Sequence, residues 1–261
     1  MAVADEFDGF LVDLDGVVWV GREPVPGAVE ALRALHSAGK EVVFVTNNPG
    51  RAPSTYAQRL RDAGVPVEDG RVVTAGVATA RLAAERVGAG SSAFVIGAPA
   101  FHESVAAAGL ALLEGEAARE ADAVLVSGHR GFDYEELLTA TLALRSGAAL
   151  FATSHDPTLP MPGGAWPGTG SILAAVETAS GARAEVGGKP ERHLFEQARA
   201  ALGAAERVAM VGDRVSSDVE GGRRAGLATI LVLSGATSRA EAAAADPAPD
   251  LVLDDLAALL R

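Results

Sequence analysis

The sequence predicts an α/β protein in which a buried parallel sheet carries helices on both faces. Short apolar runs recur along the whole chain, and segments with the spacing of amphipathic helices separate them. These runs are almost continuously apolar, which is typical of strands that are buried on both sides. Strands that alternate with helices need crossover connections, and such connections favour parallel pairing.

The predicted elements follow one another in a regular order. The first helix is expected at 29–40 and ends near Gly39, and the second is expected at 54–63 and ends at Gly64, because glycine commonly follows the last helical turn. The predicted strands are the apolar runs at 10–14, 41–48, 71–75, 92–97, 122–128, 148–153, 207–213, 228–235 and 250–255.

Composition restricts the classes of function. Of the 261 residues, 49% are hydrophobic, which is enough for the core of one large domain or of two ordinary ones. The net charge of −12 argues against nucleic acid or an anionic membrane as a partner. The lack of cysteine excludes disulfides, thiolate nucleophiles and Cys-bound zinc. We expect a cytoplasmic protein, because the N-terminus does not resemble a signal sequence and no apolar run reaches the roughly 18 residues of a membrane helix.

Two carboxylates interrupt the first apolar run, which reads FLVDLDGVVW and contains Asp13 and Asp15. Burying an unpaired carboxylate is strongly unfavourable, so either a cation lies beside the pair or the pair stands at the rim of the core. Two other predicted strands also end in polar residues, namely Thr46 with Asn47, and Asp213. The carboxyl ends of parallel strands line one edge of a sheet, so these side chains can converge on one site. Each of them could also simply form a turn after its strand.

Together with Lys189 and Asp218, these residues have the chemistry of a metal-assisted phosphate site. Carboxylates in one crevice repel one another unless a hard cation is present, and oxygen ligands suit Mg²⁺. A lysine, a hydroxyl and backbone amides suit a phosphoryl group. Asp13 can attack phosphorus, and Asp15 can give a proton to the departing alcohol and later activate water. Lys189 could instead be a solvated loop lysine, and Asp218 a carboxylate at a helix N-terminus.

Four motifs occur in a fixed order: DLDGVVW at 13–19, TNN at 46–48, GKP at 188–190 and GDRVSSD at 212–218. They resemble the four motifs of the haloacid dehalogenase (HAD) superfamily, and most closely those of its class IIA, the NagD-like or p-nitrophenyl phosphatase branch. The segment between the two groups of motifs has its own strand–helix pattern. The resemblance therefore implies a Rossmann-like catalytic core at 1–78 and 183–261, with an inserted α/β cap at 79–182 that determines substrate specificity.

The resemblance also implies a role for each motif residue. Two acids act in catalysis, Asp13 as the nucleophile and Asp15 as the general acid and base. Three groups bind phosphate: Thr46, the backbone amide of Asn47, and Lys189. The Mg²⁺ ligands are Asp13, the backbone carbonyl of Asp15, and Asp213. Asp218 is expected to support these ligands without binding the ion itself. Asp15 favours a hydrolase over a dehalogenase, because a halide leaves without a proton.

Substrate contacts are expected from two cap loops, at 127–138 and 152–164. The candidate residues are His129, Arg130, His155 and Asp156, although ordinary loop polarity explains them equally well. The second loop reads Ser-His-Asp where this branch has Asn-Pro-Asp, so no substrate can be carried over. A sugar phosphate, glycerol phosphate, phosphoglycolate and pyridoxal phosphate all remain open.

The sequence thus favours a Mg²⁺-dependent phosphatase that hydrolyses a small phosphorylated metabolite through an aspartyl phosphate. The alternative is a catalytically silent relative that binds a ligand or has a regulatory role. The intact set of acids favours the enzyme, because a binding module gains nothing from an acid beside a nucleophile. A homodimer formed through the cap is an arrangement that the resemblance leaves open.

Overall fold

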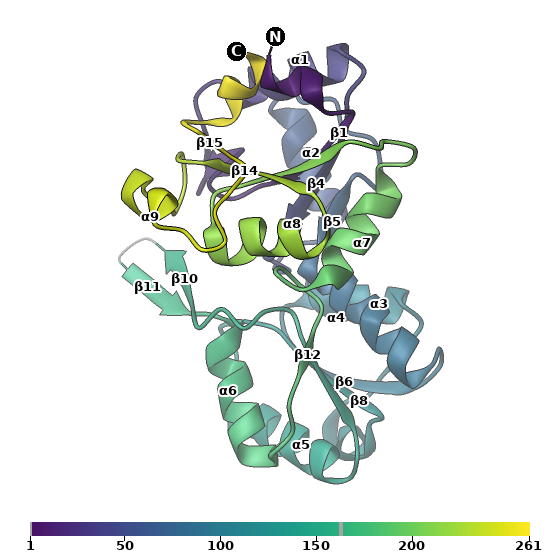
Figure 1. The fold of residues 1–261 in the computed structure, drawn as a ribbon. Helices are drawn as coiled ribbons and strands as arrows, with labels where there is room; N and C mark the ends of the chain where they lie inside the picture. The colour runs from purple at the N-terminus through teal and green to yellow at the C-terminus, as the bar shows by residue number, and fades with distance from the viewer. Residues whose placement is uncertain (1, 162–163) are drawn as a thin grey trace. The chain divides into compact units, whose positions relative to one another are not determined.

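A computed structural model describes residues 2–161 and 164–261. The chain divides into two compact units, each with its own sheet (Figure 1). The first unit comprises Met1–Thr46, Pro53–Val73 and Lys189–Arg261, and the second comprises Asn47–Ala52 and Thr74–Gly188. No helix in the described part of the chain is both long and apolar enough to span a bilayer.

The first unit is built on a six-stranded sheet. Its strands are β1 (Gly9–Asp13), β4 (Glu41–Thr46), β5 (Val72–Thr74), β13 (Val208–Gly212), β14 (Ala228–Val232) and β15 (Leu251–Leu253). They lie in the order β15-β14-β13-β1-β4-β5. β1 is central and pairs in parallel with β13 on one side and β4 on the other. The predicted α/β class with parallel strands is therefore confirmed.

Helices bury both faces of this sheet. They are α1 (Ala28–Ser37), α2 (Pro53–Asp62), α7 (Arg192–Ala201), α8 (Glu220–Arg224) and α9 (Arg239–Ala243), with short 3₁₀ turns η1 (Val3–Glu6) and η4 (Leu256–Leu260). Phe10 and Val12 of β1 pack into one apolar cluster with residues of α1, α2 and η4. On the other face, α7 packs against β4. Because successive side chains point to opposite faces, a strand covered on both sides must be apolar between its ends, as residues 10–12 of β1 are.

The second unit repeats this design on a smaller scale. Its parallel strands are β6 (Ser92–Ile96), β7 (Ala111–Leu112), β8 (Ala123–Val126), β9 (Ala149–Ala152) and β12 (Glu185–Val186), in the order β12-β9-β8-β6-β7. Its helices are α3 (Ala75–Val87), α4 (Pro99–Ala107), η2 (Gly115–Glu120), α5 (Tyr134–Arg145) and α6 (Thr169–Ser180). Val124 and Val126 of β8 pack with α5 and α6, whereas Leu125 packs with α3 and α4.

The structure adds several short strands that the sequence did not predict. Each of the predicted strands occurs, but β7, β12 and the hairpin strands β2 (Trp19–Val20) and β3 (Glu23–Pro24) have only two residues each, too few for a recognisable pattern. The Pro/Gly-rich stretch after β9 contains an antiparallel hairpin of β10 (Thr158–Met161) and β11 (Gly164–Pro167). Part of the predicted loop 152–164, residues 162–163, lies outside the described residues.

An ion pair joins the starts of β1 and β13. The Asp8 carboxylate accepts hydrogen bonds from the Arg207 backbone N–H at 3.0 Å and from its guanidinium at 2.8 Å. These bonds lower the pKa of Asp8 from 3.8 to about 2. The charged carboxylate is therefore favoured in the folded state, so its contribution to stability is present above about pH 4 and is lost as the pH falls toward about 2.

We predict that Asp8→Asn lowers the thermal unfolding midpoint slightly at pH 7, and that the gap from the unsubstituted protein narrows as the pH falls from 5 to 3, because protonation removes the same charge from the unsubstituted protein. Asp69→Asn is the control for a much more exposed ion pair: the Asp69 side chain lies 3.3 Å from Arg61 and is 96% exposed, so it should contribute little to stability at any pH. A gap that stays constant with pH would show that the ion pair does not stabilise the fold.

Candidate active site

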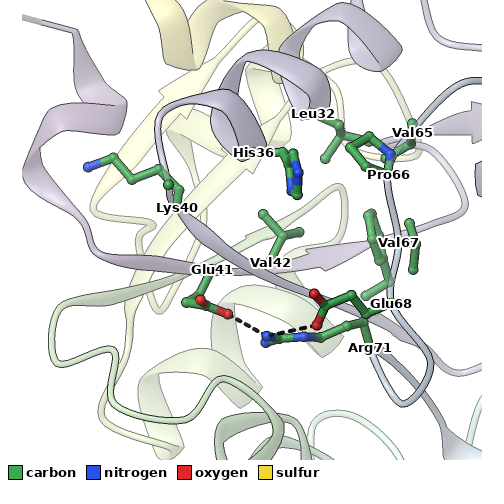
Figure 2. A pocket seen from close by; sticks show the side chains of 12 residues that line it. Leu32, His36, Lys40, Glu41, Val42, Val65, Pro66, Val67, Glu68 and Arg71 are labelled. Carbon is green, nitrogen blue, oxygen red and sulfur yellow. Dashed lines mark ion pairs between the residues drawn. The ribbon is translucent and has the colours of Figure 1, made fainter.

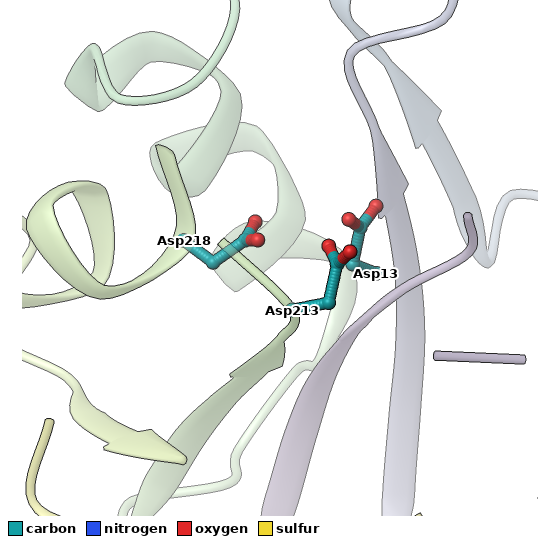
Figure 3. Close-up of side chains that lie close together, drawn as sticks. All are labelled: Asp13, Asp213 and Asp218. Carbon is teal, nitrogen blue, oxygen red and sulfur yellow. The ribbon is translucent and has the colours of Figure 1, made fainter. Parts of the chain in front are cut away.

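Three buried carboxylates meet at the carboxyl edge of the first unit's sheet. Asp13 is the last residue of β1, Asp213 follows β13, and Asp218 lies in a π-helical turn, η3 (Val215–Val219). One oxygen from each lies within 4.8 Å of the others, and Figure 3 shows the three carboxylates pointing toward one another. Such a cluster is unfavourable unless positive charge balances it.

Strand register explains why these residues converge. Asp13 pairs with Val45 of β4, so Thr46 lies one step further along the same edge, where it is buried. On the other side, Val12 pairs with Val211 of β13, which brings Asp213 to this edge as well. The parallel pairing therefore gathers side chains from three distant segments of the sequence.

Lys189 supplies positive charge within the cluster. Its ammonium lies 2.9 Å from Asp13 Oδ1 and 2.7 Å from Asp218 Oδ1, and its side chain is only 2% exposed. It is therefore not a solvated loop lysine. Burial by itself lowers the pKa of Lys189, but the neighbouring Asp13 and Asp218 carboxylates outweigh that effect and raise the pKa above its ordinary value. The lysine stays charged.

Asp218 links the lysine to the backbone at the end of β13. While its Oδ1 accepts from Lys189, its Oδ2 accepts from the Arg214 backbone N–H at 3.0 Å. Gly212 makes this close approach possible, because a Cβ at that position would lie 2.2 Å from the Asp218 carboxyl carbon. Asp218 thus lies among the carboxylates, in direct contact with the lysine.

Asp213 has an oxygen that suits a cation. Its Oδ2 accepts a hydrogen bond from the Ala236 backbone N–H at 2.6 Å, whereas its buried Oδ1 has no hydrogen-bond donor among the described residues. A buried carboxylate oxygen without a donor is costly, and a hard cation such as Mg²⁺ is the partner that such an oxygen prefers. Gly16, at φ 86°, passes so close that a Cβ there would lie 2.3 Å from Asp213 Oδ2.

The cluster carries more negative charge than its lysine can balance. Burial raises the pKa of Asp13 well above its ordinary value, and the charges of Asp218 and Asp213 add to the rise against the opposing effect of Lys189. Burial, with a further contribution from Asp218, also raises the pKa of Asp213 to about 6. The residues present therefore fit a divalent cation, which would favour the ionised form of both carboxyl groups.

Asp15 has a different environment from Asp13. It is exposed, and its Oδ1 accepts a hydrogen bond from the Trp19 indole Nε1 at 3.0 Å. The loop from Asp15 to Trp19 is compact, because the Gly16 N–H donates to the Trp19 carbonyl at 2.7 Å. Trp19 is not among the residues that the sequence predicted for the site, although its place four residues after Asp15 in DGVVW was a usable signal.

The remaining candidates lie in the second unit. Asn47 begins its short segment Asn47–Ala52. His129 Nε2 lies 3.0 Å from Glu136 Oε2, and the Arg130 guanidinium lies 4.3 Å from the centre of a tryptophan ring, that of Trp166 in β11. The structure thus gives His129 and Arg130 partners within this unit.

Both predicted specificity loops meet at the N-terminus of α6. Thr169, the first residue of this helix, accepts a hydrogen bond from the Gly128 N–H at 2.9 Å. The Gly170 N–H donates to the Asp156 carbonyl at 2.8 Å. His155 and Asp156 are both exposed at this point. The loop that contains His129 and the loop that contains His155 are thus both hydrogen-bonded to the N-terminus of α6.

A hollow of about 150 Å³ lies beside the amino-terminal end of β4 (Figure 2). Arg71 on its wall forms ion pairs with Glu41 at 2.6 Å and Glu68 at 3.6 Å. Lys40 donates to the Phe7 carbonyl at 2.6 Å. Protein groups therefore already engage these cations, and no residue of the four motifs lines the hollow.

Comparisons with known proteins agree with this geometry. A family model described as haloacid dehalogenase-like hydrolase matches residues 10–111, and a second, HAD-hydrolase-like model matches residues 186–259. The D-glycerol 3-phosphate phosphatase of Mycobacterium tuberculosis is 37% identical over 99% of this chain and 72% of its own length. The chain belongs to the haloacid dehalogenase-like hydrolases. The family resemblance drawn from the four motifs is thus confirmed.

Solved structures of other HAD-like hydrolases share the whole fold. A glycerol phosphate phosphatase from Mycobacterium tuberculosis in complex with magnesium superposes with a TM-score of 0.92 at 36% identity, covering 100% of this chain and 78% of that one. The p-nitrophenyl phosphatase from Archaeoglobus fulgidus superposes with a TM-score of 0.90 at 31% identity, covering 97% of this chain and 98% of that one. These relatives belong to the branch that the motifs indicated.

We predict that Lys189→Met lowers the free energy of unfolding by about 3–5 kcal/mol, because it leaves buried carboxylates without their cation. Urea unfolding in EDTA measures the loss. The remaining carboxyl groups should take up protons in the folded state. Stability then falls as the pH rises, so the loss should be larger at pH 8 than at pH 5.

The double variant Lys189→Met/Asp218→Asn is the control for this experiment. It removes one of the stranded charges and should be more stable than Lys189→Met alone. Equal stability of the two variants, with no dependence on pH, would show that charge balance is not what the lysine provides.

Proposed function

We propose that this HAD-like hydrolase is a Mg²⁺-dependent phosphatase that hydrolyses a small phosphomonoester through an aspartyl phosphate on Asp13. The single observation that carries the proposal is the Lys189 ammonium held between Asp13 and Asp218, beside the Asp213 oxygen that has no donor among the residues described. This arrangement offers a nucleophile, a fixed cation and an anionic site for a metal within one edge of one sheet. Relatives that are named phosphatases support the same reaction.

In the first step, Asp13 attacks the phosphorus of the ester. We assign the attack to Oδ2, because Oδ1 accepts hydrogen bonds from Lys189 and from the Leu14 N–H at 2.8 Å. The bond between phosphorus and the leaving oxygen breaks, and Asp15 gives its proton to that oxygen. Lys189 orients the nucleophile and offsets the negative charge of the phosphoryl group.

In the second step, water hydrolyses the aspartyl phosphate. Asp15, now ionised, takes a proton from the water as the water oxygen bonds to phosphorus. The bond between phosphorus and Asp13 breaks, which releases inorganic phosphate and restores both carboxyl groups. The Thr46 hydroxyl and the Asn47 backbone N–H are the donors that we assign to the phosphoryl oxygens.

We assign the metal site to this chain's own oxygen ligands. Asp13, Asp213 and the backbone carbonyl of Asp15 would hold Mg²⁺, with Asp218 keeping Lys189 and the Arg214 backbone in place. When bound, the ion acts as a Lewis acid that offsets the charge of the phosphoryl group. The magnesium complex of the Mycobacterium tuberculosis phosphatase supports this choice of ion.

Turnover of p-nitrophenyl phosphate tests the proposal. We expect activity with Mg²⁺, loss of activity after treatment with EDTA, and recovery when Mg²⁺ is restored. Asp13→Asn should have no measurable turnover, because an amide oxygen is a far weaker nucleophile than a carboxylate. An unsubstituted protein that binds phosphate esters but hydrolyses none would favour the silent, ligand-binding alternative. Full activity in EDTA would contradict the metal assignment.

We also propose that the second unit selects the substrate. The catalytic residues meet only the phosphoryl group and the leaving oxygen, which every ester shares, so discrimination requires contact with the rest of the molecule. His129, Arg130, His155 and Asp156 are our candidates for this contact. Relatives that act on glycerol phosphate and on p-nitrophenyl phosphate support a small alkyl or aryl ester.

We predict that His155→Ala and Asp156→Ala change the order of preference in a panel of phosphorylated metabolites, measured as kcat/KM. Turnover of p-nitrophenyl phosphate should change less, because this ester offers little for hydrogen bonding. Glu103→Ala is the control in the same unit, because Glu103 is exposed on α4. A uniform loss on every ester would assign the two residues to catalysis or folding instead.

Two further expectations go with this proposal. A homodimer formed through the cap and a cytoplasmic location stay predictions, the first from the family resemblance and the second from the sequence. Sedimentation of the purified protein at several concentrations would decide the first, and fractionation of the cells that produce it would decide the second.

A further inference from the structure

We infer that Trp19 is a positioning residue for Asp15: its indole N–H holds one carboxyl oxygen, so that the other delivers the proton to the leaving group. The inference rests on the proposed function, in which Asp15 is the general acid. It concerns one contact within the first motif to which no role has been assigned above, the hydrogen bond from Trp19 Nε1 to Asp15 Oδ1 at 3.0 Å.

The direction of this hydrogen bond favours one oxygen of Asp15 for the proton. An indole N–H can only donate, so Asp15 Oδ1 accepts. In a protonated carboxyl group the carbonyl oxygen is a stronger acceptor than the hydroxyl oxygen, so this contact favours the proton on Oδ2. Asp15 is exposed, so packing does little to restrict its side chain. The hydrogen bond from Trp19 therefore orients the Asp15 carboxyl group, whereas burial restricts the carboxyl group of Asp13.

The indole itself is held firmly. Trp19 is 3% exposed, and its ring stacks on Tyr56 of α2, with ring centres 6.4 Å apart and an angle of 11° between the planes. The guanidinium carbon of Arg59, one turn further along α2, lies 3.9 Å from the centre of the Trp19 ring. Arg59 also donates to the Gly21 carbonyl at 2.8 Å, which ties the turn between β2 and β3 to the same helix. These contacts fix the direction of the N–H.

A fixed acid matters most when the leaving group is a poor one. Proton transfer to an alkoxide requires the acid within hydrogen-bond reach of the leaving oxygen at the moment the bond breaks. A p-nitrophenolate ion leaves without that help. Loss of the Trp19 donor should therefore slow alkyl esters and spare the aryl ester, which a purely structural role would not do.

The test replaces Trp19 with 3-benzothienylalanine, which keeps the shape of the ring and replaces the N–H with sulfur. We expect kcat/KM for glycerol phosphate to fall about tenfold or more, because Asp15 becomes a carboxylate as it gives up its proton and the Trp19 donor stabilises that charge. For p-nitrophenyl phosphate the fall should be less than about twofold. The ratio kcat/KM is the right measure, because it includes the departure of the leaving group and excludes later hydrolysis of the phosphoenzyme. Trp19→Phe is the second variant, with the thermal unfolding midpoint measured for both.

Asp15→Asn supplies the control in a double-mutant cycle. If Trp19 acts through Asp15, the analogue should cost almost nothing further in the Asp15→Asn background. Additive losses, equal losses on alkyl and aryl esters, or a faster variant would each overturn the inference.

An NMR measurement separates this inference from the proposed function. The chain has two tryptophans, so one indole N–H resonance should move in Asp15→Ala while that of Trp166 stays in place as an internal reference. If neither resonance moves, the hydrogen bond is absent in solution and the inference fails, whatever the activity. If the resonance moves but the unsubstituted enzyme hydrolyses no ester, the proposed function fails, and the positioning role fails with it.

Discussion

The candidate site depends on one buried cation placed between two carboxylates. Lys189 contacts Asp13 at 2.9 Å and Asp218 at 2.7 Å in a place where none of the three is exposed to solvent. Removing the lysine leaves both carboxylates buried without their counter-charge, which is far less favourable than leaving all three in place. The carboxyl ends of β1 and β13 can lie next to each other, each carrying an aspartate, because this lysine reduces the repulsion between them. The remaining excess of negative charge is what makes the site suitable for a metal ion.

Close backbone approaches complete this arrangement. Gly212 lies against Asp218, and Gly16 lies against Asp213, at distances that no side chain would allow. The loop after β1 therefore turns sharply, and it presents Asp15 away from the buried cluster. The result is two carboxyl groups two residues apart with opposite environments. Asp13 is buried and fixed by the lysine, whereas Asp15 is exposed and its side chain is hydrogen-bonded to an indole. Such a difference suits a nucleophile and an acid that must carry a proton to a substrate.

The second unit shows how the same physical design serves another purpose. Its parallel sheet also ends in loops, but these carry exposed polar residues such as His155 and Asp156 instead of a buried charge cluster. The N-terminus of α6 binds the backbone of one loop and, through Thr169, that of another. Loops that are supported at their bases and exposed at their tips can change sequence without loss of the fold. This is consistent with relatives that share the fold and differ in the ester they are named for.

The sequence by itself determined the α/β class, the positions of the main strands and the strand-end residues of the site. A strand buried on both faces must be apolar up to its end, as β1 is as far as Val12 and β13 is throughout, so the polar residue at or just after its end can be read locally. The boundaries 1–78, 79–182 and 183–261, and the roles of the site residues, stay predictions; by compactness alone, the structure divides the chain near 74 and 188. Only the tertiary structure decided that Lys189 contacts Asp218, that Trp19 donates to Asp15, and that Asp213 keeps an oxygen with no donor in the described parts of the chain. Those facts depend on the order of the strands, on which face of α2 packs against the hairpin of β2 and β3, and on which backbone amides reach each carboxylate. None of these leaves a periodic pattern in the sequence, because each is a contact between side chains or amides that packing alone brings together.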